Sequence, residues 1–151
     1  MKARPLLSLV VGTRPNFVKA APLLPALRVA GFRVRLVHTG QHYDPGMSQA
    51  LFRDLGLPRP DANLGVGAGP HAAQTARALE RFDRDLVRHP PCAVLVFGDV
   101  NSTLAAALAA AKREIPLAHV EAGLRSFDRS MPEELNRILV DQLSTLLFTT
   151  L

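Results

Sequence analysis

The sequence has a single cysteine, Cys92, no tryptophan, and no apolar run near the roughly 20 residues that a membrane-spanning helix needs. One cysteine cannot form an internal disulfide, which excludes a disulfide-stabilised scaffold. The apolar residues after Cys92 predict that it is a buried strand residue. The apolar run at 6–11 leads into a Gly-Thr-Arg-Pro turn without a small-residue cleavage site, which favours a first strand over a signal peptide. We therefore expect a cytoplasmic domain with no membrane segment.

Acidic residues are outnumbered by basic ones, giving a formal charge of +5 and a pI near 10.3. A positively charged chain is compatible with an anionic binding partner, so nucleic acid has to be considered as one. However, the three lysines and fifteen arginines are spread along the chain, and Tyr43 is the only tyrosine or tryptophan that could stack on bases. We expect no nucleic acid partner, because a small anionic ligand needs only one or two well-placed arginines.

The 151 residues, with 48% hydrophobic and 21% charged content, fit one globular domain. Short apolar runs predict strands at 6–11, 32–38, 92–97, 115–120 and 146–150. Apolar residues at helical spacing predict helices near 15–31, 47–55, 71–88, 102–112 and 132–143. Strands that alternate with helices predict an α/β fold with a doubly wound, Rossmann-like parallel sheet.

Polar residues follow several predicted strands, at the edge where an open parallel sheet places its ligand crevice. Asp99 and Glu121 come directly after two of these strands, and a solvated loop is the alternative interpretation of the charges around Glu121. Arg14 and Lys19 lie at the start of the first helix, whose N-terminus could receive a phosphate. A plain turn with exposed basic residues explains that segment equally well.

Other local predictions concern helix starts and a long loop. Gln41 is expected to cap the turn that follows it, and the role of His42 is left open. Asn101 or Ser102 is expected to cap the helix at 102–112. The segment 57–70 is rich in proline and glycine, and is either a mobile lid or a passive crossover. Its Gly-Val-Gly-Ala-Gly lacks the strand-to-helix context of a dinucleotide fingerprint.

The sequence contains, in this order, GTRPNFVKAAPL, TGQHYDPGMS, NLGVGAGPHAAQT, VFGDVNSTLAAALAAAKREIP and HVEAGLRSFDRSMPEELNRILVDQLSTLLF. Together these segments resemble the non-hydrolysing UDP-N-acetylglucosamine 2-epimerase family. The resemblance implies a glycosyltransferase-B-like architecture, of which residues 1–151 form the amino-terminal half. The second, UDP-binding domain is then expected beyond Leu151.

The reaction that the resemblance implies interconverts UDP-N-acetylglucosamine and UDP-N-acetylmannosamine, with UDP eliminated to a 2-acetamidoglucal and added back after inversion at C2. No metal or other cofactor is implied. A proton leaves C2 on one face and returns on the other, so two acid/base groups serve better than one. The resemblance assigns Asp99, Glu121 and Glu133 to this task.

The resemblance also implies substrate-binding residues. Arg14 would stabilise the departing β-phosphate, with Lys19 as a second candidate. Arg125 and Arg137 would hold the loop and helix that carry the glutamates, and His42 would be a further contact. Glu134 is expected to interact with the helix dipole rather than to catalyse. The hypothesis requires the three acids and Arg14 to meet along one rim of the sheet.

Two departures and one alternative accompany this hypothesis. Asn16 stands where many members have glutamate, which indicates a subgroup, and QHYD replaces the QHR that carries an allosteric role in some members. The chain alone is expected to turn over little or no substrate, because half of the cleft is missing. The alternative is a non-catalytic remnant or a partner-binding domain. A homodimer through helices of this domain is also expected from the family.

Overall fold

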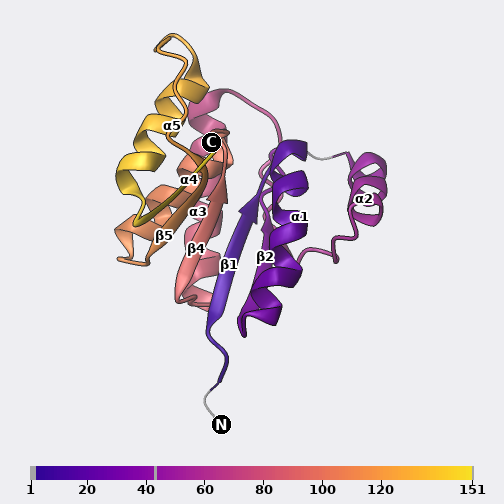
Figure 1. Ribbon diagram of the computed structural model, residues 1–151. Helices are drawn as coiled ribbons and strands as arrows, with labels where there is room; N and C mark the ends of the chain where they lie inside the picture. The colour runs from indigo at the N-terminus through magenta and orange to yellow at the C-terminus, as the bar shows by residue number, and fades with distance from the viewer. Residues whose placement is uncertain (1–2, 43, 151) are drawn as a thin grey trace.

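The computed structural model describes residues 3–42 and 44–150, and strands alternate with helices throughout (Figure 1). The strands are β1 (Leu6–Val11), β2 (Arg33–His38), β3 (Ala62–Asn63), β4 (Ala93–Phe97), β5 (Leu117–Ala122) and β6 (Leu146–Thr149). The helices are α1 (Arg14–Val29), α2 (Pro45–Asp54), α3 (His71–Arg88), α4 (Asn101–Lys112) and α5 (Pro132–Leu143). Within the described residues, none of these helices is both long enough and apolar enough to span a membrane.

The described strands form one six-stranded sheet in the order β3-β2-β1-β4-β5-β6, and all neighbouring pairs are parallel. The prediction of a doubly wound parallel sheet is therefore confirmed. The direction of winding reverses between β1 and β4, which are hydrogen-bonded neighbours. A reversal of this kind opens a crevice at the carboxyl ends of the two strands, where ligands bind in open α/β sheets.

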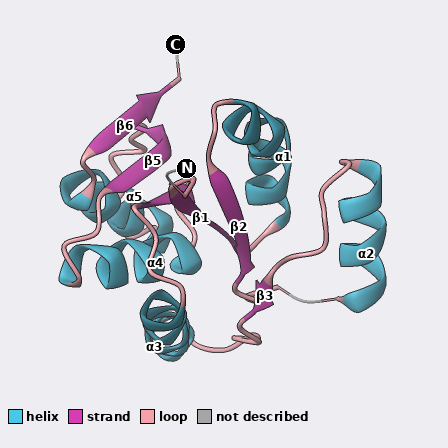
Figure 2. Cartoon of the chain, turned by 90° about the horizontal axis from the view of Figure 1, so that it is seen from below, coloured by secondary structure: helices cyan, strands magenta, loops and turns pink. Residues whose placement is uncertain are grey.

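Helices cover both sides of the sheet, with α1 and α2 on one side and α3, α4 and α5 on the other (Figure 2). Successive residues of a strand point to opposite faces, so β1 supplies Leu9 to the core under α1 and Val10 to the core under α3, α4 and α5. Because both faces are covered, β4 is continuously apolar and Ser8 is the one polar residue of β1. The alanines of α4, such as Ala106 and Ala110, are buried and let this helix lie close to the sheet.

Two details of the sequence-based expectation are wrong, and one short strand was not predicted. Cys92 is exposed, because it precedes β4 and only its backbone N–H, which donates to Leu6 O, joins the sheet. The fifth strand runs to Ala122 rather than ending at Val120. The loop at 57–70 contains the short edge strand β3, which its proline and glycine content conceals.

Candidate functional site

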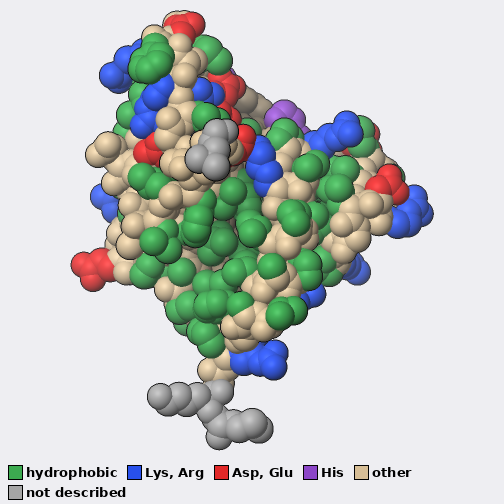
Figure 3. Space-filling view, in the orientation of Figure 1, with side chains coloured by type: hydrophobic (Ala, Val, Ile, Leu, Met, Phe, Trp, Pro, Cys, Tyr) green, Lys and Arg blue, Asp and Glu red, His purple; other side chains and the backbone are tan. Residues whose placement is uncertain are grey.

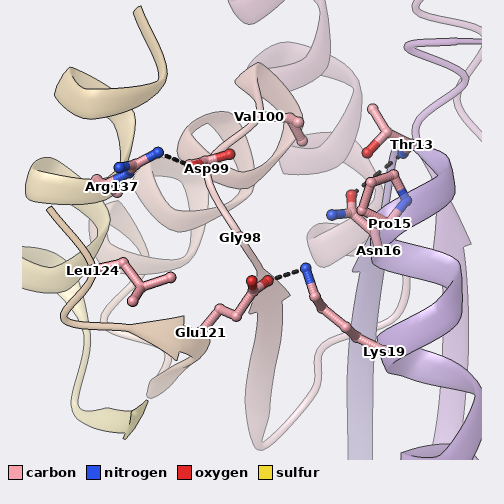
Figure 4. Close-up of a pocket in the computed structure, with 10 residues that line it drawn as sticks. All are labelled: Thr13, Pro15, Asn16, Lys19, Gly98, Asp99, Val100, Glu121, Leu124 and Arg137. Atoms are coloured by element: carbon pink, nitrogen blue, oxygen red, sulfur yellow. Dashed lines mark hydrogen bonds and ion pairs between the residues drawn. The ribbon is translucent and has the colours of Figure 1, made fainter. Parts of the chain in front are cut away.

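A pocket of about 100 Å³ lies at the carboxyl ends of β1, β4 and β5, where the winding reverses (Figure 4). Its walls come from the start of α1, the turn after β4, the end of β5 and one residue of α5. They consist of Thr13, Pro15, Asn16, Lys19, Gly98, Asp99, Val100, Glu121, Leu124 and Arg137. Ligand pockets for whole small molecules usually measure about 300–1,000 Å³, so this pocket has room for part of a ligand.

Glu121 enters the pocket from β5 and forms an ion pair with Lys19 of α1. The register of β5 on β6 shifts between Val120 and Ala122, and Glu121 within this bulge has a φ of 70°. Left-handed backbone is uncommon for a residue with a side chain, and strained residues cluster at functional sites. The bulge therefore directs this carboxylate across the pocket towards α1, as Figure 4 shows.

Asp99 enters the same pocket from the turn after β4 and receives a hydrogen bond of 2.5 Å from Arg137 Nη2. Arg137 Nη1 donates to Glu134 Oε2 at 3.0 Å, so the guanidinium is held by a second carboxylate. Glu134 is 1% exposed and also accepts from Ser126 N at 2.7 Å and Ser126 Oγ at 2.6 Å. The hydrogen bond from the Ser126 hydroxyl is the main reason that the pKa of Glu134 is lowered.

Glu134 therefore has a structural contact that the sequence-based prediction of a dipole partner did not include. It anchors the loop after β5 and holds Arg137 against Asp99. Arg125 acts on the same loop: its Nη1 donates to Asp141 Oδ2 of α5 at 2.7 Å. Arg125 thus joins the loop to the helix that begins with Glu133, whereas Arg137 reaches into the pocket itself.

Glu133, Arg14 and His42 lie outside the first pocket. Glu133 and His42 line a second pocket of about 260 Å³, and Arg14 and His42 line a third of about 370 Å³. Val100 lines both the first and the second pocket, so these two are neighbours. The three acids and Arg14 thus all lie at the carboxyl edge of the sheet, but they line separate pockets.

Asn16 is a site residue whose structural part the sequence reasoning missed. It is 3% exposed, its Oδ1 accepts from Gly12 N at 3.0 Å and Thr13 N at 3.3 Å, and its Nδ2 donates to Phe97 O at 3.2 Å. One side chain thus fixes the turn after β1 to the end of β4, across the switch point. The position of Asn16, three residues after Thr13 and third in α1, is the feature of the sequence that could have predicted this capping contact.

Gln41 caps a helix, but not the turn that follows it in the chain. Its Oε1 accepts from Ser102 N at 2.9 Å and from Ser102 Oγ at 2.6 Å, and so closes the N-terminus of α4. The prediction that Asn101 or Ser102 caps α4 is wrong, because Val100 occupies the cap position. Asn101 instead bridges helices, donating to Gln74 Oε1 at 2.9 Å and accepting from Asn136 Nδ2 at 3.2 Å.

The side chains at this edge are suited to acid–base chemistry on an anionic ligand. Two carboxylates face one small pocket from neighbouring strands, and each has a cationic partner that an anionic ligand could contact. In the parts of the chain that the structure describes, no group of three or more histidine, cysteine, aspartate or glutamate side chains is arranged to hold a metal ion.

A doubly wound sheet with an ion-paired pocket at its switch point defines an α/β protein of the kind that binds ligands at the carboxyl edge. The family model described as UDP-N-acetylglucosamine 2-epimerase matches residues 26–151. The chain belongs to the UDP-N-acetylglucosamine 2-epimerase family. Its fold is the first half of a glycosyltransferase-B-like architecture.

Relatives confirm the extent of the match. A UDP-N-acetylglucosamine 2-epimerase homolog of Methanococcus maripaludis is 50% identical over 93% of this chain and 39% of its own length. The UDP-2,3-diacetamido-2,3-dideoxy-D-glucuronate 2-epimerase of Pseudomonas aeruginosa is 48% identical over 92% of this chain and 40% of its own. The crystal structure of Methanocaldococcus jannaschii UDP-GlcNAc 2-epimerase with UDP-GlcNAc and UDP gives a TM-score of 0.92 at 46% identity, covering 95% of this chain and 40% of that one. The chain spans about 40% of the length of these relatives.

Proposed function

We propose that this chain forms the first half of the active site of a UDP-N-acetylglucosamine 2-epimerase, which interconverts UDP-N-acetylglucosamine and UDP-N-acetylmannosamine. The observation that carries the proposal is the pair of carboxylates, Asp99 and Glu121, that face one pocket from adjacent strands. The names of the relatives supply the reaction, and the complex of the Methanocaldococcus enzyme supplies the ligand class.

Two acids on different walls suit a reaction that inverts C2. One carboxylate takes the proton from C2, the electrons of the broken C–H bond form the C1=C2 double bond, and the C1–O bond breaks as UDP leaves with its electron pair. Return of a proton to the opposite face of C2, with re-addition of UDP at C1, then gives the epimer. When one acid/base group lies on each face of C2, the sugar does not have to flip within the site between the two proton transfers.

Lys19 is better placed than Arg14 to interact with the two candidate acids and with a phosphate bound beside them. It lines their pocket from within α1 and already contacts Glu121, whereas Arg14 is exposed and lines a neighbouring pocket. A β-phosphate that reaches Lys19 competes with Glu121 for the same ammonium group. Substrate binding thereby loosens the ion pair and frees the carboxylate for proton transfer, while Lys19 stabilises the charge on departing UDP.

Most of the nucleotide has to be bound elsewhere, because the pocket at Asp99 and Glu121 measures about 100 Å³. We assign that part to the second domain, which corresponds to the remaining length of the relatives. Arg14 and His42, in the adjoining pocket, extend the surface available to the substrate, and Glu133 remains the third candidate acid/base residue. The isolated chain is then a poor catalyst, because the reacting groups and the bound nucleotide are not held together.

A homodimer in the cytoplasm is part of the proposal. Leu135 and Leu139 lie one helical turn apart on α5 and are 39% and 47% exposed, with Met131 at 38% a turn earlier. Such an apolar stripe on a surface helix fits a second copy of the same helix. Sedimentation should show a dimer that Leu139→Glu converts to monomer, whereas Val29→Glu, at a 90% exposed position at the end of α1, should leave it intact.

A chimaera tests the epimerase proposal. This chain is fused to the part of the Methanocaldococcus enzyme that follows the matched region, and product formation from UDP-N-acetylglucosamine is followed by NMR. We expect activity in the parent chimaera and losses of at least about 100-fold in Asp99→Asn and Glu121→Gln. Glu80→Gln, at an exposed position of α3, is the control. A folded chimaera that binds UDP but does not epimerise would favour the non-catalytic remnant.

A further inference from the structure

His119 of β5 is completely buried and uses both ring nitrogens. Its Nδ1 lies 2.7 Å from Asp141 Oδ1 of α5, and its Nε2 lies 2.7 Å from the carbonyl oxygen of Gly98. Gly98 immediately precedes Asp99, and His119 lies two residues before Glu121. The ring therefore connects the two strand ends that carry the candidate acids.

The partners of the ring decide its protonation. A carbonyl oxygen only accepts, so Nε2 carries a proton. Asp141 Oδ2 accepts from Gly123 N at 3.0 Å and from Arg125 Nη1 at 2.7 Å. Burial opposes ionisation of Asp141, but the hydrogen bonds from Arg125, His119 and Gly123 outweigh it and lower its pKa. An ionised Asp141 also only accepts, so Nδ1 has to donate as well.

We propose that His119 is a buried imidazolium, paired with Asp141, that positions the loops after β4 and β5. The charged group that faces the ring is Asp141 of α5, and Arg125 from the loop after β5 joins it through the second carboxylate oxygen. On the β4 side the ring meets the backbone of Gly98. Loss of either ring proton releases one of these two attachments.

The effect of His119 on the two candidate acids matters only if the proposed function is right, whereas the charge state of the His119 ring does not depend on that function. Gly98 has a φ of 66° and is followed by Asp99, and the Gly123 amide held by Asp141 comes two residues after Glu121. A neutral ring would free Gly98 or Asp141, and with it the turn that aims one of the acids. His119 is thus a positioning residue, which does not itself line the pocket.

His38 provides an internal comparison. It is also buried, but its Nδ1 accepts a hydrogen bond of 2.8 Å from Gly40 N. A backbone N–H only donates, so Nδ1 of His38 carries no proton and the ring is neutral. Burial lowers the pKa of His38 to about 4, in agreement with that assignment. The same sheet therefore holds two buried histidines in opposite charge states.

Ring ¹⁵N NMR of the 151-residue chain at pH 7, without substrate, tests the charge state. We expect both nitrogens of His119 to resonate as protonated nitrogens, and His38 to show one protonated and one unprotonated nitrogen. In Asp141→Asn, which removes the counter-ion, His119 should show an unprotonated nitrogen at the same pH. An unprotonated nitrogen on His119 in the unmutated chain would overturn the proposal.

The same spectra test positioning. At pH 7 the backbone amide signal of Asp99 should differ between the unmutated chain and Asp141→Asn, because the ring of His119 links Asp141 to the Gly98 carbonyl, whereas the amide signal of Gly40 should not differ. An Asp99 amide signal that is the same in both chains would refute the positioning role. Because no ligand is added, this result is independent of whether the chimaera epimerises its substrate.

Discussion

Acidification from pH 7 to pH 5 should destabilise the chain through His38, a buried ring that stays neutral when folded. His38 is 1% exposed, packs edge-on against Phe17 with ring centroids 5.0 Å apart, and accepts from Gly40 N. Its pKa falls from 6.5 to about 4 on burial. Between these values the unfolded chain binds a proton that the folded chain does not, so stability falls as the pH drops below 6.5 and levels off below about 4.

The size of the effect follows from those two pKa values. At pH 7 the difference in proton binding contributes only a few tenths of a kcal/mol, and at pH 5 it amounts to about 2 kcal/mol against the folded state. Carboxylates change little over this range, because their usual pKa values lie near 4. The loss of about 2 kcal/mol is large beside the roughly 5–15 kcal/mol that holds a typical domain folded.

Urea unfolding followed by circular dichroism at pH 7, 6 and 5 measures this loss. His38→Asn keeps an acceptor oxygen near the position of Nδ1 but does not titrate, so its stability should fall by about 2 kcal/mol less than that of the unmutated chain over the same range. His89→Asn changes an exposed histidine and should retain the full pH dependence. Equal losses in the unmutated chain and His38→Asn would refute the reasoning.

Two further substitutions probe the site. Gln41→Ala leaves the buried N–H of Ser102 without its acceptor, although the Ser102 hydroxyl can still donate to Thr39 Oγ1, and should lower the free energy of unfolding by about 1–3 kcal/mol. Gln142→Ala at an exposed position should change it by less than about 0.5 kcal/mol, and equal effects in urea unfolding would show that Gln41 is not the cap. Lys19→Ala in the chimaera should lower kcat/KM by at least about tenfold through loss of the phosphate contact, with Lys112→Ala unchanged; steady-state kinetics that do not separate the two lysines would remove Lys19 from the mechanism.

The architecture was predictable because it depends on periodicity along the chain. Apolar runs located the five longer strands, and helical spacing located the helices, with errors of a few residues at the ends. The bounds of β5 differ because Glu121 adopts a positive φ within a bulge, a conformation that its residue type does not announce. The two residues of β3 are too few to produce a pattern.

The candidate site was predictable only in part. Parallel strands end at one edge, so the approach of Asp99 and Glu121 follows from the topology. The ion-pair partners of these two acids do not follow from the topology, because Lys19 is 102 positions from Glu121 in the sequence and Arg137 is 38 positions from Asp99. Gln41 and Ser102 are likewise 61 positions apart. Contacts between residues so far apart in the sequence depend on how the elements pack and on how far each side chain reaches. Local spacing in the sequence does not encode either.

The most direct test of the central claim is the fate of the hydrogen at C2. When the chimaera converts UDP-N-acetylglucosamine in deuterated water, the proton that a carboxylate removes exchanges with solvent before one returns from the other face. Mass spectrometry of the UDP-N-acetylmannosamine formed should therefore show one deuterium at C2, and neither product nor deuterium should accumulate in Asp99→Asn or Glu121→Gln. Product that retains its original hydrogen at C2, or undiminished exchange in both variants, would contradict the account.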